Sequence, residues 1–175
     1  MKRRPKTSTL VVIAAIVVLA VLLTVLAAAN AARVKRVSAG LPTDAFHLVT
    51  STGTTTVTRE ELMKLPLQKV TVTLDTSTTS AKKKVYAGLP LRELFKDLDM
   101  PFSADNYSIA SGSDGFTMTY LADEIQAGKV WLVLQEDGKA LPGRAQGGFG
   151  PFLIVTQGEQ FSLRWCKYLQ TLTVK

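Results

Sequence analysis

Residues 86–98 read YAGLPLRELFKDL and contain the best-marked helix of the chain. Proline suits the first turn of a helix, because its missing N–H is not needed there, so the helix is expected to begin after Pro90. From Leu91 to Leu98, apolar residues fall at spacings i, i+3, i+4 and i+7, with charged residues between them. This spacing places one apolar stripe against a core and a charged face toward solvent.

Segments with strand character surround this helix on both sides. Short apolar or alternating stretches bounded by Gly, Pro, Ser and Asp predict strands. The expected strands are 46–50, 70–74, 107–110, 116–119, 130–135, 152–156 and 169–175. Short helices are expected at 59–64, behind the capping box Thr58-x-x-Glu61, and at 120–126, with polar loops at 51–56 and 76–84. The fold class is therefore α+β and strand-rich.

An apolar run at residues 10–29 precedes this domain. It carries no charge, and its length matches what a helix needs to cross about 30 Å of hydrocarbon. We expect a basic cytoplasmic tail at 1–9, a transmembrane signal-anchor at 10–29, a linker at 30–44 and one domain at 45–175. The run predicts contact with a lipid bilayer.

Lys2, Arg3, Arg4 and Lys6 precede the apolar run, and such a cluster tends to stay in the cytoplasm. The expected location is a single-pass cell-membrane protein with an extracytoplasmic C-terminal domain. Residues 27–32 also offer the small residues of a cleavage site, so a removable signal peptide is the alternative.

The formal net charge of +7 belongs to the N-terminal segment. Residues 1–36 carry seven basic side chains and no acidic one, and residues 37–175 carry equal numbers of basic and acidic side chains. A neutral domain gives no electrostatic case for nucleic acid, so no nucleic-acid partner is expected. Another membrane or exported protein remains a candidate partner.

The residues that could carry chemistry are few. Cys166 is the only cysteine and His47 the only histidine, so no disulfide, CxxC-type zinc site or histidine-based catalytic triad is expected. We predict no catalytic residue and no metal ligand. The glycine-rich run 146–151 could cradle an anion on its N–H groups, and Lys82–Lys84 could attract one.

Several short motifs, in their order and spacing, resemble the oxidoreductase molybdopterin-binding domain, the sulfite oxidase fold. They are residues 57–66, 86–94, 113–116, 136–142, 148–155 and 164–169. The resemblance implies a sulfite oxidase-like, strand-rich α+β fold over about residues 46–174. It also implies that Arg164 and Lys167 match basic positions near the phosphate of a bound pterin.

Two departures from the family concern its cofactor. The resemblance implies a molybdenum-ligating cysteine at the position of Thr76, and a hydroxyl is a poor substitute for a soft thiolate. A Pro-Leu-Arg run, whose arginine helps hold the pterin phosphate, is replaced here by Pro151-Phe152-Leu153. These departures favour a domain without the cofactor.

The expected function is therefore a membrane-anchored ligand- or partner-binding module without catalysis or cofactor. The alternative is a molybdopterin-dependent oxidoreductase that passes electrons to a membrane partner, with Arg164 and Lys167 as pterin contacts. A structural or adhesive ectodomain is the third interpretation.

Overall fold

The computed structural model describes residues 7–38, 41–77 and 79–175. Helix α1 covers Thr7–Ser38, and its stretch Val11–Ala32 is long and apolar enough to cross a membrane. The side chains of that stretch are exposed. An apolar N-terminal helix of this kind fits a single-pass anchor or a signal sequence. Met1–Ala39 and Gly40–Lys175 are separate compact units, and the second has a core of its own.

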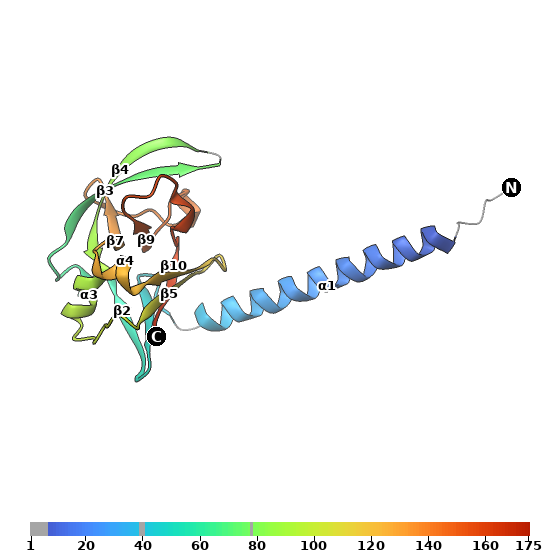
Figure 1. The fold of residues 1–175 in the computed structure, drawn as a ribbon, viewed down its shortest axis with the longest axis horizontal. Coiled ribbons are helices and arrows are strands. Elements are labelled where there is room, and N and C mark those ends of the chain that lie inside the picture. Colours follow the sequence, from blue (N-terminus) through green and yellow to red (C-terminus); the bar gives the residue numbers. More distant parts are fainter. Residues whose placement is uncertain (1–6, 39–40, 78) are drawn as a thin grey trace. The chain divides into compact units, whose positions relative to one another are not determined.

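The second unit contains two five-stranded sheets joined by short helices (Figure 1). Sheet A has the order β2-β1-β10-β5-β6, and sheet B has the order β3-β4-β7-β8, with β9 paired to β7. The strands are β1 Ala45–Thr50, β2 Gly53–Thr58, β3 Gln68–Thr76, β4 Thr79–Pro90, β5 Tyr107–Gly112, β6 Thr117–Leu121, β7 Val130–Glu136, β8 Lys139–Ala140, β9 Leu153–Thr156 and β10 Leu169–Val174. The helices are α2 Arg59–Leu62, α3 Leu91–Asp97 and α4 Ala122–Gln126, with 3-10 turns η1 Arg144–Gln146 and η2 Ser162–Arg164. The expected strand-rich α+β class is confirmed.

Strand β7 shows how sheet B buries both of its faces. Side chains alternate between faces along a strand, so Val130, Leu132 and Leu134 join the main core with residues of sheet A and α3. Trp131 and Val133 point the other way, into a second apolar cluster. Loop residues, including Trp165 and Leu141, cover that second cluster. The continuous apolar run in the sequence is the expected mark of a strand buried on both sides.

Two helix starts match the prediction, at the capping box of α2 and at Pro90 before α3, although α2 ends at Leu62 rather than at the expected residue 64. Thr58 and Glu61 form the capping box of α2, with the Thr58 N–H donating to the Glu61 carboxylate at 2.7 Å. Helix α3 begins after Pro90 and buries Leu91, Leu94 and Phe95 of its predicted apolar stripe, while Leu98, just past its end, is half-buried. It ends in a Schellman motif, because the Met100 N–H donates to the Phe95 carbonyl and the Asp99 N–H to the Lys96 carbonyl.

Two predicted loops are wrong. Residues 53–58, which include most of the loop expected at 51–56, form β2, and residues 79–84 extend β4 instead of lying in the loop expected at 76–84. Both segments are polar because they form exposed strands of hairpins, in which backbone pairing with β1 or β3 supplies the order. A tally of apolar residues misses such strands. The helix expected at 120–126 is α4, which begins two residues later because Tyr120 and Leu121 finish β6.

Candidate functional site

Thr76, which stands where the resemblance implies a metal-ligating cysteine, is the last residue of β3. Its Cα partner is Thr79 of β4, so it lies near the end of a long hairpin, which projects from the body of the unit in Figure 1. The preceding residue, Asp75, is tied to η2, because the Ser162 hydroxyl donates to the Asp75 carbonyl at 2.7 Å and accepts from its N–H. The end of β3 is thus near the segment that carries Arg164. The hydroxyl of Thr76 provides no soft anionic ligand there.

Arg164 is held by two carboxylates. Its guanidinium makes a two-point contact with Glu124, one arm at 2.8 Å, and lies 2.7 Å from a carboxylate oxygen of Glu159. It also donates to the Thr119 carbonyl and lies over the Tyr120 ring. The Arg164 hydrogen bond is the main cause that lowers the Glu124 pKa, which keeps that partner ionised. A guanidinium neutralised in this way is a poor phosphate ligand.

Lys167 has a different environment. Its ammonium lies 4.1 Å from the centroid of the Phe149 ring, a cation–π contact. Arg144, a residue that the sequence did not single out, lies over the neighbouring Tyr168 ring at 5.5 Å. No ion pair joins Arg144 or Lys167 to another of the described residues. These two cations remain able to attract an anion.

The glycine-rich run 146–151 is built for close packing. The N–H groups of Gly147, Gly148 and Gly150 all donate to main-chain carbonyls of residues 142–144. A Cβ at Gly148 would lie 2.1 Å from the Pro142 carbonyl oxygen, so no larger residue fits there without a shift. These three glycines do not form the anion cradle that the sequence allowed, because their N–H groups are used within the loop.

The lone cysteine and histidine are not placed for chemistry. Cys166 is fully buried in the main core, and burial raises the pKa of its thiol to about 12, so the reactive thiolate is rare at neutral pH. His47 lies on β1 with its ring Nδ1 3.4 Å from the Thr56 hydroxyl across the hairpin. Among the residues that the structure describes, no three His, Cys, Asp or Glu side chains gather as a metal site.

The residues of the family's cofactor site therefore do not fit the cofactor as a set. Thr76 and Arg164 lie in one region, but the first lacks a thiolate and the second is already paired with Glu124 and Glu159. Lys167 is the one expected pterin contact without a carboxylate partner among the described residues. We derive no chemistry through a molybdenum centre from this arrangement.

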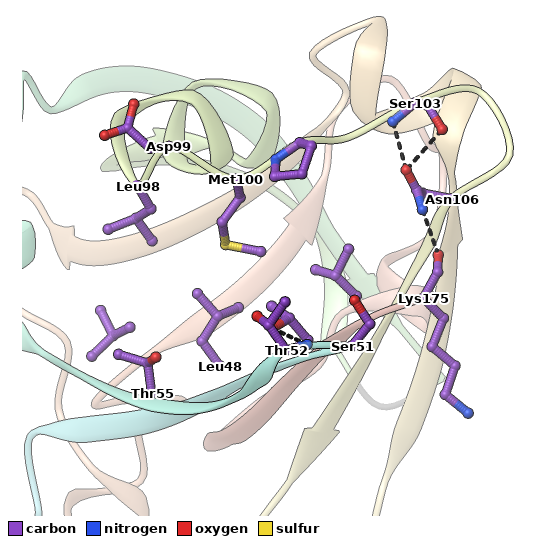
Figure 2. Close-up of a pocket in the computed structure, with 14 residues that line it drawn as sticks. Leu48, Ser51, Thr52, Thr55, Leu98, Asp99, Met100, Ser103, Asn106 and Lys175 are labelled. Carbon is purple, nitrogen blue, oxygen red and sulfur yellow. Dashed lines mark hydrogen bonds between the residues drawn. The ribbon is translucent and has the colours of Figure 1, made fainter.

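A cavity of about 750 Å³ lies elsewhere, between sheet A and the segment that follows α3 (Figure 2). Its volume is in the range of small-molecule sites. It is lined by Leu48, Thr50, Ser51, Thr52, Thr55, Val57, Leu98, Asp99, Met100, Pro101, Ser103, Asn106, Val174 and Lys175. The sequence reasoning missed it, because the lining comes from segments far apart in the chain. The one signal available was the half-apolar stretch 98–102 directly after a helix.

Comparison with known proteins places the fold. No family model matches the sequence, and no curated relative matches it. Among solved structures, the sulfane dehydrogenase SoxCD from Paracoccus pantotrophus is similar, with a TM-score of 0.61 and 16% sequence identity. The match covers 75% of this chain but only 38% of that chain. At this identity the likeness shows that the chain shares a fold with part of a dehydrogenase.

Proposed function

We propose that this protein is a membrane-anchored domain of the sulfite oxidase fold that works as a binding module without molybdenum catalysis. The observation that carries this proposal is the Arg164 cluster. The guanidinium that the resemblance assigns to a pterin phosphate is matched here by two carboxylates of the same chain. A second supporting observation is Thr76, whose neutral hydroxyl stands where the resemblance implies a soft sulfur ligand.

The cofactor proposal is tested by metal and pterin analysis of the purified full chain. The protein is produced in a host that makes the molybdenum cofactor, beside a Thr76→Cys variant and a molybdenum oxidoreductase purified in the same way. We expect neither molybdenum nor pterin above background in the wild-type chain. A stoichiometric amount of both, with Thr76 unchanged, would overturn the proposal.

The anchor and its orientation form a second part of the proposal. Helix α1 is supported as an anchor by its apolar length, and the basic residues before it favour a cytoplasmic N-terminus. The only native cysteine is buried, so a Thr54→Cys substitution on the exposed β2 gives one reactive thiol. An impermeant maleimide should label this variant on intact cells and the membrane fraction should retain it. Labelling only after lysis would reverse the orientation, and full release into the medium would indicate a cleaved signal peptide.

The alternative function, a molybdopterin-dependent oxidoreductase subunit, is favoured by one observation. Arg144 and Lys167 lie on aromatic rings beside the glycine-rich loop without a carboxylate partner among the described residues. Under this alternative, an Arg144→Gln/Lys167→Gln double variant would lose bound pterin. Under the binding-module proposal, the same variant has no pterin to lose.

A further inference from the structure

The cavity beside β1 adjoins the face of sheet A that packs into the main core. Leu48, Val57 and Val174 belong to the main core, yet they also form the floor of the cavity. The same face continues to Thr55, which is directly opposite Leu48 in the β1–β2 register. The three apolar floor residues are themselves buried, so the accessible lining of the cavity comes mainly from Thr55 on this side and from Leu98, Met100 and Pro101 on the other.

The opposite wall is set by the end of α3. The Schellman motif turns the chain at Asp99, whose φ of 50° is in the left-handed region. This turn places Leu98 and Met100 across the cavity from Leu48, as Figure 2 shows. Both side chains are half-buried, so part of their apolar surface faces the cavity. The two walls together form an apolar slot.

The polar groups at the rim are mostly used within the protein. The Thr50 and Thr52 hydroxyls bond to each other at 2.8 Å, and the Asn106 side chain bonds to Ser103 and to the Lys175 carbonyl. In Figure 2 the charged ends of the two ionic lining residues, Asp99 and Lys175, are directed away from the space between Leu48 and Met100. The slot therefore offers apolar contact and hydroxyls but no charge. A charged ligand group would lose its hydration there without a partner.

We propose that this slot binds the apolar chain of an uncharged lipid drawn from the adjacent membrane. The lipid source rests on the proposed function, because it requires α1 to be an anchor. Only residues 39–44 separate the end of α1 from β1, and a chain of that length spans at most about 25 Å. With α1 as an anchor, the length of this connection sets an upper limit on the distance between the domain and the bilayer surface. The Ser51 and Thr55 hydroxyls, which have no side-chain hydrogen bond to the described residues, would meet the polar end of the lipid.

The test is photo-crosslinking of the full chain in lipid nanodiscs. The probe is a monoacylglycerol with a diazirine in its acyl chain, and labelled peptides are mapped by mass spectrometry. We expect label on peptides that contain Leu48 and Met100, and also on α1. A Thr55→Trp variant fills part of the slot with an indole and should reduce labelling of the slot about tenfold. This is roughly the loss in affinity expected when two methylene groups of the lipid chain are no longer buried.

Thr54→Trp is the matched control, because successive residues of a strand point to opposite faces and Thr54 does not line the slot. Thermal unfolding of both variants verifies that they fold. Label on α1 without label in the slot overturns the lipid site but leaves the anchor intact. Label in the slot without label on α1 overturns the membrane source and the anchor. Absence of both overturns both proposals. A second probe, the same monoacylglycerol with a phosphate on its glycerol, should label the slot less, and equal labelling by it would overturn the assignment of an uncharged ligand.

Discussion

Replacing Arg164 with Met tests whether this residue stabilises the fold. The substitution keeps a long side chain but removes the guanidinium that bridges Glu124 and Glu159. The two carboxylates then lie near each other without a cation. The variant should therefore be less stable than the wild type, because each carboxylate loses its partner while still partly buried.

The magnitude follows from burial. The three side chains are 30%, 23% and 29% exposed for Arg164, Glu124 and Glu159, so the cluster is neither on the surface nor in the core. Exposed pairs contribute up to about 1 kcal/mol, and breaking a fully buried pair costs roughly 3–5 kcal/mol. We expect a loss of about 2 kcal/mol. Urea unfolding of the unit that begins at Gly40 measures it, with Lys64→Met at an exposed ion pair as the control.

The effect should depend on pH. The pKa of Glu124 is lowered in the folded protein, first by the Arg164 hydrogen bond, so the pair stabilises above the unfolded pKa near 4.5. That stability disappears as the pH falls through the lower folded pKa. The difference between wild type and Arg164→Met should therefore be largest at neutral pH and shrink as the pH falls below about 4.5. Equal stability of the two proteins at pH 7 would refute the structural role of Arg164.

Three further substitutions or treatments test other parts of the structure. Arg59 donates to two main-chain carbonyls of distant segments, at 2.7 and 3.0 Å. A lysine cannot reach both carbonyls, so Arg59→Lys should lower the free energy of unfolding by about 1–3 kcal/mol. Urea titration measures this change, and an unchanged free energy would contradict the role of Arg59. Gly148→Ala should lower the thermal midpoint more than Gly143→Ala, because a Cβ at Gly148 would lie 2.1 Å from a backbone oxygen, whereas one at Gly143 would meet only the end of the Gln146 side chain at 3.1 Å; the reverse order would show that the loop can shift. Cys166 should resist iodoacetamide at pH 8 until urea unfolds the chain, and rapid alkylation of the native protein would contradict its burial.

Much of the fold could be predicted because its signals are local. The stripe that ends at Leu98, the capping box at Thr58 and the apolar run of β7 each depend on neighbours within a few residues. The threonines of β2 and the lysines of β4 lack such a signal. Their strand conformation depends on pairing with β1 and β3, which a linear pattern of polar residues does not reveal.

The candidate sites were less predictable, because they depend on contacts between distant segments. The family resemblance implied a place near a pterin phosphate for both Arg164 and Lys167, whereas the structure pairs Arg164 with two carboxylates and leaves Lys167 on an aromatic ring. Arg59 was predicted only as the first residue of a helix, yet its guanidinium reaches across to β7 and the segment before β9. Nothing in the local sequence distinguishes these roles.

The ratio of molybdenum to protein in the full chain isolated from membranes tests the central claim most directly. The account predicts no molybdenum above the background of the preparation, because Thr76 offers no thiolate and Arg164 is already neutralised. One molybdenum atom per chain would contradict it.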